Sequence, residues 1–340
     1  MEGIKDSMAG QSGFSIIVCT FNGATRLAAT LQSLAALNRQ GYRVELIVVN
    51  NACTDDTDAV VAGTWHQSGT PFPMRLLHMP TPGKSHALML AFDEAAFELI
   101  VICDDDNRLS PDYLQVAADI MAGDPNVGIA GGRAEAVADQ PLPAWFYEIQ
   151  YAYACGCPHN VSADFTGRAM LWGAGMVLRK KVATTIMHPD CPTALTGRNA
   201  GRLTAGEDDE KCVRTWLLGY KTWFDYRLLL WHYMPAQRLT PDYAARLQQG
   251  FTEQGPYISA YRRLFDYQFR YRHSYHPLRQ FFAWIMSILM GKSSMRKASA
   301  EMLTIATGLK WWSNPFINNA LNFQAFANSR SLMYHPIPGA

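Results

Sequence analysis

The sequence has no excess of charge of either sign. Its 340 residues include 30 Lys and Arg and 29 Asp and Glu, which gives a formal net charge of +1. Proteins that bind nucleic acid through their overall charge carry a clear basic excess, so this balance argues against a nucleic acid partner. The sequence also contains no internal repeat and no low-complexity segment. Since 49% of its residues are apolar, it can bury a large core.

Long apolar segments are absent as well. Residues 1–13 are polar and small, without the apolar segment of a signal peptide. The longest apolar run, Phe281–Met290, is about half of the ~20 residues that a membrane-spanning helix needs. The seven cysteines are an odd number and several lie in predicted strands, as for buried thiols in a reducing compartment. We therefore expect a cytoplasmic protein with a flexible N-terminus at residues 1–12.

One small cluster of cysteine and histidine raises the question of a zinc site. Cys155, Cys157 and His159 lie close together, and Cys191 is a candidate for a fourth ligand. Paired zinc-binding cysteines are usually separated by at least two residues, whereas one residue separates this pair. The spacing therefore disfavours zinc.

The first half of the chain alternates between strands and helices. The apolar run at 14–19 predicts a strand buried on both faces, and 44–49 predicts a second buried strand. A third, short strand is expected at 74–78 and a fourth at 99–103, with helices at 54–65 and 84–96. Such alternation predicts a parallel sheet, in which ligands bind at the carboxyl ends of the strands. The second half is less regular. It predicts a strand over Leu171–Leu178 interrupted by glycines, a helix over Asp209–Leu218, a strand over Thr222–Leu230, and mostly helix from Pro241.

The strongest chemical signal is the triplet Asp104–Asp106 at the end of the fourth predicted strand. Three adjacent carboxylates repel one another unless water or a cation compensates them, and a hard divalent ion is such a cation. The alternative is a solvated acidic turn before the helix that Ser110 and Pro111 are expected to start. The position at the end of a buried strand favours the metal site.

A second acidic cluster, Glu207–Glu210, precedes a predicted helix. Carboxylates are common at helix N-termini for capping alone, so by itself this cluster indicates little. Together with Asp104–Asp106 it suggests a division of labour, in which one cluster holds a metal and the other supplies a base.

Two nucleotide-binding motifs can be set aside. Gly83-Lys84-Ser85 resembles the end of a P-loop, but His78 occupies the earlier glycine position. The loop after the first strand, Thr20–Ala24, is not the glycine-rich dinucleotide fingerprint. A nucleoside triphosphatase and a nicotinamide dehydrogenase are therefore disfavoured. His232 follows an apolar run, where a lone histidine is more often structural.

The order and spacing of the motifs resemble a family 2 glycosyltransferase of the GT-A fold. The resemblance covers residues 13–240 and is carried by Ser15–Asn22, Glu45–Asn51 with Thr54–Thr57, Asp104–Asp106 and Gly206–Asp208. It implies an α/β fold, a Rossmann-like and mostly parallel sheet flanked by helices. A mainly helical C-terminal extension would span residues 241–340.

The resemblance also implies roles for individual residues. Asp208 would be the catalytic base with support from Glu207, and Asp106 and His232 would bind Mg²⁺ or Mn²⁺. Trp172 would form a wall for sugar or acceptor, although a core tryptophan is equally compatible with the sequence. The donor would be bound by Thr20, Phe21, Asn22, Asn51, Lys84, Asp104 and Asp105.

The resemblance leaves the nucleotide open, because many relatives carry Asp where this chain has Asn50 or Asn51. An asparagine still accepts a hydrogen bond through its carbonyl oxygen, so a UDP-sugar is favoured, with GDP and dTDP left open. The implied reaction is metal-dependent transfer of the sugar, with inversion, to a hydroxyl of a glycan or lipid-linked acceptor.

Two other functions stay open. A sugar nucleotidyltransferase shares the broad architecture but normally has a glycine-rich, arginine-containing loop after the first strand, which this sequence lacks. A non-catalytic carbohydrate-binding protein would need neither acidic cluster. Finally, the basic segment Arg262–Arg279 and the apolar run Phe281–Met290 fit either peripheral contact with the inner face of a membrane or an ordinary helical cover of the sheet.

Overall fold

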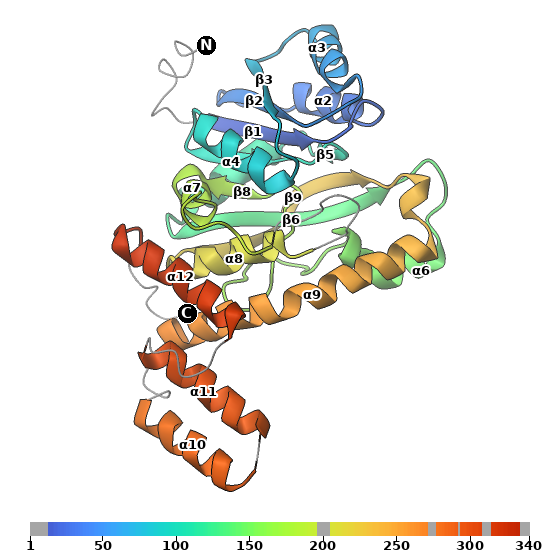
Figure 1. Ribbon diagram of the computed structural model, residues 1–340. Helices are drawn as coiled ribbons and strands as arrows, with labels where there is room; N and C mark the ends of the chain where they lie inside the picture. The colour runs from blue at the N-terminus through green and yellow to red at the C-terminus, as the bar shows by residue number, and fades with distance from the viewer. Residues whose placement is uncertain (1–12, 196–204, 271–276, 292, 308–313, 334–340) are drawn as a thin grey trace.

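The computed structural model describes residues 13–195, 205–270, 277–291, 293–307 and 314–333. The predicted flexible N-terminus at residues 1–12 lies outside this range. Within the described residues the strands form a nine-stranded mixed sheet in the order β3-β2-β1-β4-β8-β6-β9-β5, with β7 attached to β9. Figure 1 shows helices packed along this sheet and a helical C-terminal region below it.

The first four strands of the chain are the parallel half of the sheet. They are β1 (Gly13–Thr20), β2 (Arg43–Asn51), β3 (Met74–Met79) and β4 (Leu99–Ile102). β1 pairs in parallel with both β2 and β4, and β2 with β3, so all four end at the same edge. Ile16 and Ile17 of β1 belong to different core clusters, one on each face of the sheet. β1, β2 and β4 are therefore buried almost along their whole length, as expected for strands covered on both faces, whereas β3 at the edge of the sheet is only partly buried.

Helices cover both faces of this half. One face packs against α2 (Leu27–Ala35), α3 (Thr57–Gln67) and α5 (Tyr113–Gly123), and the other against α4 (Lys84–Glu94), α7 (Lys180–Ile186) and α8 (Glu207–Leu217). The predicted helices at 54–65 and 84–96 are confirmed, with starts and ends shifted by a few residues. The helix expected to start at Ser110 and Pro111 begins instead at Tyr113, with Asp112 as its N-cap residue.

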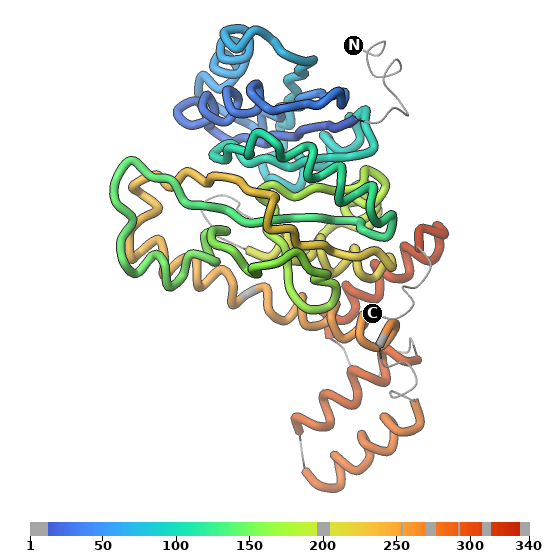
Figure 2. The backbone as a smooth tube through the Cα atoms, turned by 180° about the vertical axis from the view of Figure 1, so that it is seen from behind, coloured from blue at the N-terminus to red at the C-terminus, as the bar shows by residue number. Residues whose placement is uncertain are grey.

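The second half of the sheet contains the antiparallel pairs. β8 (Val177–Arg179) lies antiparallel between β4 and β6 (Val127–Val137). β6 pairs in parallel with the long β9 (Lys221–Tyr233), and Figures 1 and 2 show these two strands side by side. β5 (Asn107–Leu109) and β7 (Ala163–Asp164) are short and pair antiparallel with β9. The predicted strand Thr222–Leu230 is thus confirmed as part of β9.

The predicted strand Leu171–Leu178 is wrong for most of its length. Strand β8 begins only at Val177, and the preceding residues form turns and irregular backbone. Gly175 has φ +73°, in the left-handed region that a strand cannot contain. The hydroxyl of Tyr113 donates a 2.5 Å hydrogen bond to the Gly175 carbonyl and fixes this bend. The segment that contains Gly173 and Gly175 is therefore a turn that precedes β8, and not a strand interrupted by glycines.

The remaining elements lie after β6 and after β9. A short helix α6 (Ala144–Ile149) and a 3₁₀ turn η1 (Gln150–Tyr153) follow β6. After β9 come a 3₁₀ turn η2 (Ala236–Arg238), the long α9 (Pro241–Phe265) and a π-helical turn η3 (Asp266–Arg270). The chain continues in α10 (Pro277–Leu289), α11 (Ser293–Thr307) and α12 (Pro315–Ser329). In the part of the chain described, no helix is long and apolar enough to cross a bilayer.

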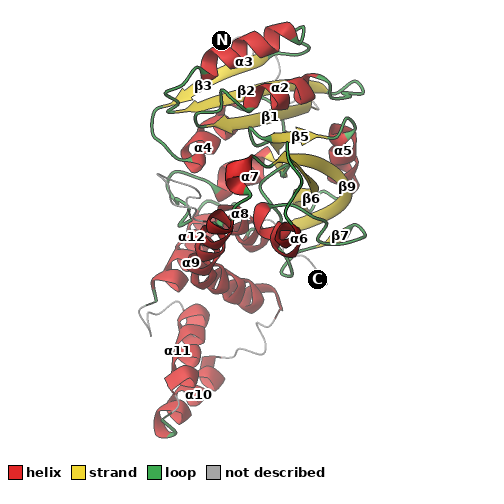
Figure 3. Ribbon diagram, turned by 90° about the vertical axis from the view of Figure 1, so that its right-hand side faces the viewer, coloured by secondary structure: helices red, strands yellow, loops and turns green. Residues whose placement is uncertain are grey.

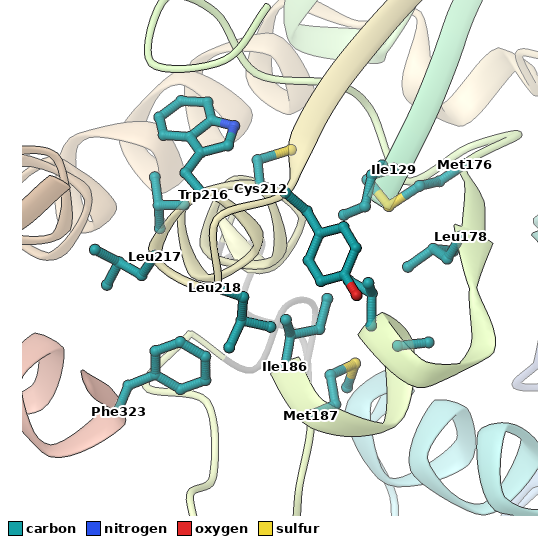
Figure 4. Close-up of a cluster of buried hydrophobic side chains, with 14 of the residues drawn as sticks. Ile129, Met176, Leu178, Ile186, Met187, Cys212, Trp216, Leu217, Leu218 and Phe323 are labelled. Carbon is teal, nitrogen blue, oxygen red and sulfur yellow. The ribbon is translucent and has the colours of Figure 1, made fainter. Parts of the chain in front are cut away.

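The helices α9 and α12 share a core with the sheet. Figure 4 shows Leu217 of α8 and Leu218, which directly follows the helix, close to Phe323 of α12, with Ile129 of β6 and Leu178 of β8 on the other side. These side chains are almost fully buried. The proposed boundary between a catalytic domain at 13–240 and an extension at 241–340 stays a prediction. By contrast, Figures 1 and 3 show α10 and α11 projecting away from the body as a hairpin.

Candidate active site

A single cavity of about 720 Å³ lies at the carboxyl ends of the parallel strands. Residues at the ends of β1, β2 and β4 form its floor, and the starts of α8 and α9 contribute further walls. Of the residues to which the family resemblance gives a role, every one except Asn22 lines it: Thr20, Phe21, Asn51, Lys84, Asp104, Asp105, Asp106, Trp172, Glu207, Asp208 and His232. The two acidic clusters, about a hundred positions apart in the chain, therefore face the same space.

The first two carboxylates of the triplet each have a basic partner. Lys84 Nζ lies 2.5 Å from Asp104 Oδ1. Arg26 donates through two nitrogens to the two oxygens of Asp105, at 2.9 and 2.7 Å, and Thr20 Oγ1 donates to the same carboxylate at 2.5 Å. This bidentate pair ties the start of α2 to the end of β4.

Lys84 also connects the two acidic clusters electrostatically. Burial would lower the pKa of its ammonium group, but the carboxylates of Asp104, Asp208 and Glu207 outweigh burial and raise that pKa. Lys84 is therefore charged at neutral pH and lies between the clusters. A cation in this position is suited to a negatively charged ligand such as a diphosphate.

The third carboxylate, Asp106, meets an arginine and a histidine. Arg238 Nη1 lies 2.8 Å from Asp106 Oδ2, and His232 Nε2 lies 3.4 Å from Oδ1. β9 places His232 directly opposite Asn107 of β5, the residue that follows Asp106. Burial would lower the pKa of His232, but Asp106 raises it to about 9. Without a bound cation, both partners of Asp106 are thus positively charged at neutral pH, and His232 would release its proton on binding a metal.

The side chains of Asp106 and His232 suit a divalent cation whose remaining ligands come from the substrate. The described residues contain no group of three or more His, Cys, Asp or Glu that could enclose a metal by themselves. Asp106 and His232 supply one carboxylate and one imidazole, ligand types that suit Mn²⁺ or Mg²⁺. Such ions are commonly held by one or two protein groups together with substrate phosphates. The other side of Asp106 is taken by Arg238.

Asp208 is held by two donors at the start of α8. Its Oδ2 accepts a 2.8 Å hydrogen bond from the Gly173 backbone N–H, and Lys211 Nζ lies 2.8 Å from Oδ1. A Cβ at position 173 would lie 2.2–2.4 Å from the Asp208 carboxyl group, so only glycine permits this approach. Burial would raise the pKa of Asp208, but Lys211 and Lys84 outweigh it and lower the pKa. Asp208 is therefore ionised at neutral pH.

The pKa values of Glu207 and Asp209, the neighbours of Asp208, are shifted in the opposite direction. Burial and the charge of Asp208 raise the pKa of Glu207. Burial, Asp208 and Glu207 together raise the pKa of Asp209 to about 7. All three carboxylates line the cavity. The cavity thus holds one carboxylate, Asp208, that is ionised at neutral pH and two, Glu207 and Asp209, whose pKa values are raised. Such a separation of pKa values is typical of acid–base sites.

Two asparagines predicted to contact the donor form hydrogen bonds that organise loops. Asn51 Nδ2 donates to the carbonyls of Met79 and Thr81 at 3.2 and 2.7 Å, and its Oδ1 accepts from the Gly83 N–H at 2.7 Å. Its amide therefore clamps the segment that leads to Lys84. Asn22 Oδ1 accepts from the Thr54 N–H at 2.8 Å. Both side chains shape the rim, and the role of each in binding the nucleoside stays a prediction.

One end of the cavity is aromatic. The rings of Trp172 and Tyr151 stack with centroids 6.3 Å apart and an interplanar angle of 28°. Tyr153 and, from α9, Leu247 and Phe251 line the same cavity. Tyr151 is 52% exposed, so this surface is open to solvent and suits the apolar face of a sugar ring.

The cysteine cluster is divided among different environments. Cys155 is buried, with its Sγ 3.8 Å from Nδ1 of His232, while Cys191 belongs to the main core. Cys157 Sγ contacts the carbonyl of His159. Among the described residues these side chains do not form a metal-binding group.

Sequence reasoning missed the basic partners. Arg26, Arg238 and Lys211 each contact a carboxylate of the predicted site. Arg238 is the first basic residue after His232, and Lys211 directly follows the second acidic cluster, so both had a weak positional signal. Arg26 had none, because nothing in the sequence pairs the start of α2 with Asp105.

The fold and the cavity define an α/β enzyme of the GT-A type, with its site at the carboxyl edge of a mostly parallel sheet. The sequence model of the family described as Glycosyl transferase family 2 matches residues 15–186, slightly more than half of the chain. The chain belongs to this family and is a glycosyltransferase.

Individual relatives are distant. The succinoglycan biosynthesis protein ExoM of Rhizobium meliloti (strain 1021) is 25% identical over 197 residues, which are 57% of this chain and 58% of that protein. The chain thus spans little more than half the length of this relative.

Solved structures resemble the chain in fold. A structure of GalNAc-T7 with UDP, GalNAc and Mn²⁺ has a TM-score of 0.51 at 11% identity, covering 75% of this chain and 51% of that one. The mannosyltransferase PcManGT from Pyrobaculum calidifontis, in complex with GDP-Man and Mn²⁺, has a TM-score of 0.49 at 19% identity, covering 94% and 76%.

Proposed function

We propose that this glycosyltransferase transfers a sugar from a nucleoside diphosphate to a hydroxyl of a glycan or lipid-linked acceptor, with inversion at the anomeric carbon. The observation that carries the proposal is that Asp104–Asp106 and Glu207–Asp209 face one cavity at the carboxyl ends of parallel strands. A role in polysaccharide biosynthesis is part of the proposal, supported by the similarity to the succinoglycan biosynthesis protein.

The donor is proposed to bind along the floor of the cavity. Thr20, Phe21 and Asn51 lie at the ends of β1 and β2, where a nucleoside would be placed, and Asp104 and Asp105 follow β4. Lys84, charged and 2.5 Å from Asp104, would turn its ammonium group toward a diphosphate. A UDP-sugar is the preferred donor in this proposal, and GDP and dTDP donors are the alternatives to be tested.

The leaving group is proposed to be stabilised at Asp106. Asp106 and His232 would hold Mg²⁺ or Mn²⁺, and such an ion would supply positive charge to the departing diphosphate. Arg238, which lies 2.8 Å from Asp106, would add a guanidinium group suited to phosphate oxygens. Lys84 and Arg238 then contact the diphosphate from two sides.

Asp208 is proposed to accept the proton of the attacking hydroxyl. Lys211 keeps it ionised, and the Gly173 N–H fixes its orientation. A single base that serves a single displacement requires attack from the face opposite the leaving group, so the anomeric configuration inverts. Trp172 and Tyr151 would hold the acceptor sugar by stacking.

A panel of nucleotide-sugars tests the proposal. Purified protein is incubated with UDP-, GDP- and dTDP-sugars and Mn²⁺, and slow donor hydrolysis is followed together with thermal stabilisation by the corresponding diphosphates. One nucleotide should stabilise the fold, and its sugar should be released. NMR of a transfer product from an α-linked donor should show a β linkage.

The same assay separates the two alternatives. A sugar nucleotidyltransferase would release pyrophosphate from a nucleoside triphosphate and a sugar phosphate. A carbohydrate-binding protein would bind sugars without turning over any donor. Either result would replace the transferase proposal, and a retained α linkage would remove the inverting mechanism.

A further inference from the structure

The α10–α11 hairpin presents its apolar side chains to solvent. Phe282, Met286 and Leu289 follow the spacing i, i+4, i+7, which places them on one face of α10, and Met290 directly follows the last residue of the helix. Phe282 is 63% and Leu289 73% exposed. We call these four side chains the apolar stripe. A surface helix of a globular protein normally turns such a stripe toward the core.

The usual pattern of burial is reversed on α10, where a polar side chain is buried and large apolar side chains are exposed. Ser287, a small polar residue, is buried, whereas its large neighbours Ile288 and Leu289 are exposed. α10 packs mainly against α11, and Figures 1 and 3 show both helices extending away from the sheet. More than half of the large exposed apolar side chains among the described residues lie between positions 278 and 295. The apolar stripe is therefore an unusual concentration rather than scattered surface residues.

The charge around the stripe has one sign. The sequence contains no Asp or Glu between Asp266 and Glu301, although the whole chain is nearly neutral. Among the described side chains of this segment, Arg279, Arg296 and Lys297 are exposed. Glu301 is buried and forms an ion pair with Arg263, so its charge is compensated. The hairpin thus combines exposed apolar groups with uncompensated basic charge.

We propose that the α10–α11 hairpin docks on an anionic lipid surface. The apolar stripe enters the boundary between headgroups and acyl chains, while Arg279, Arg296 and Lys297 contact anionic headgroups. α10 has 13 residues, too few to cross a bilayer, so it lies in the plane of the interface. A second copy of this chain is a poorer occupant, because a two-fold interface would bring two basic surfaces together. The docking surface does not depend on the proposed transfer chemistry.

Co-sedimentation of the full-length protein with lipid vesicles tests the proposal. Vesicles contain phosphatidylcholine alone, or phosphatidylcholine with a third of the lipid replaced by phosphatidylglycerol, each at low and high salt. The protein should sediment with the anionic vesicles and much less with the neutral ones, and high salt should weaken binding. The double variant Phe282→Glu/Leu289→Glu should reduce the partition coefficient by about tenfold or more.

A control variant places one glutamate on an exposed apolar residue outside the hairpin. Val161 is 55% exposed and lies far from the hairpin in the sequence, so Val161→Glu should bind vesicles like the unchanged protein. Thermal stabilisation by nucleoside diphosphates should be equal in all three proteins, which separates this test from that of the transferase function.

Two results would overturn the proposal. The first is equal vesicle binding by the double variant and the Val161→Glu control. The second is a lipid-free dimer, detected by light scattering, that Phe282→Glu/Leu289→Glu dissociates. That dimer would assign the stripe to a second copy of the chain.

Discussion

Lys211 Nζ lies 2.8 Å from Oδ1 of Asp208, and the lysine side chain is only 1% exposed. The two residues are one helical turn apart at the start of α8. A buried ammonium group so close to a carboxylate stabilises the ionised form of that carboxylate. The proposed base is therefore kept charged by a residue on its own helix, and two predictions follow from this pair.

Replacement of Asp208 by Asn should remove the base and preserve the shape of the site. Loss of a general base typically costs a factor of about 10²–10⁴ in rate, so kcat should fall by this amount. Donor affinity, measured by calorimetry with a nucleoside diphosphate, should hardly change. Asp209→Asn is the matched control, because Asp209 also lines the cavity and its pKa is raised to about 7. A larger loss in Asp209→Asn would transfer the role to Asp209.

Replacement of Lys211 by Met should move the acidic limb of the pH–rate profile. Burial would raise the pKa of Asp208, and Lys211 and Lys84 lower it below the ordinary value. Without Lys211 the pKa must rise, so the variant should lose activity at a higher pH than the unchanged enzyme as the solution is acidified. Methionine keeps the apolar stem packed, which limits the effect on folding.

The control for this experiment is Lys221→Met. Lys221 pairs with Asp124 at 3.0 Å, on the surface and outside the lining of the cavity. Its replacement should leave the pH profile in place. An acidic limb that is identical in Lys211→Met and the unchanged enzyme would contradict the assignment of Asp208 as the titrating base.

The parallel half of the sheet could be predicted from the sequence because burial on both faces leaves a simple signature. The central parts of β1 and β2, residues 16–19 and 46–49, are uninterrupted apolar runs. The residues that follow β1, β2 and β4 meet at one edge by the geometry of parallel strands. This rule alone brings Thr20, Asn51 and Asp104 together. It therefore located the cavity before any side chain was placed.

The pairing of side chains in the site could not be predicted, because it depends on contacts between segments that are far apart in the sequence. The pairing of Arg26 with Asp105 and of Arg238 with Asp106 joins residues 79 and 132 positions apart, and no local pattern encodes it. The segment before β8 was misjudged because its glycines weaken an apolar run without revealing that the backbone turns. The assignment of Asn51 to the donor stays a prediction, and the sequence did not reveal that its amide also holds the neighbouring loop. Spacing located the site, but it did not reveal how the side chains pair.

Arg238 should compete with a divalent cation for Asp106. Two unit charges about 4 Å apart interact by ~4 kcal/mol in a surface-like dielectric, so removing the guanidinium charge should strengthen cation binding. Arg238→Met should therefore bind Mn²⁺ about tenfold more tightly without nucleotide, measured by calorimetry. Binding of a nucleoside diphosphate should weaken, because a phosphate partner is lost.

Asp106→Ala is the companion variant. It should remove both nucleotide-independent and nucleotide-dependent Mn²⁺ binding and abolish turnover. Full activity of the unchanged enzyme in excess EDTA would remove the metal from the proposal. Equal Mn²⁺ affinity in Arg238→Met and the unchanged enzyme would mean that Arg238 and the cation do not share Asp106.

Asn51 should not tolerate the aspartate that many relatives carry in this region. Its Nδ2 donates to the carbonyl oxygens of Met79 and Thr81 at 3.2 and 2.7 Å. An aspartate would replace this donor by a carboxylate oxygen, so that acceptors would face one another with no hydrogen between them. An unsatisfied buried group costs about 1–3 kcal/mol, so Asn51→Asp should lower the free energy of unfolding by this amount in urea titrations. Because the same loop leads to Lys84, affinity for nucleoside diphosphates should fall as well.

Asn22→Asp is the matched control for this substitution, because the Asn22 side chain accepts a hydrogen bond from the Thr54 N–H through Oδ1. An aspartate oxygen can accept the same bond, and aspartate, like asparagine, adopts the left-handed backbone found at φ +50°. Stability should therefore change little in Asn22→Asp. If Asn51→Asp were as stable as this control and bound the nucleotide more tightly, the side chain would contact the nucleoside directly, and the clamp on the Met79–Gly83 loop would have no role in donor binding.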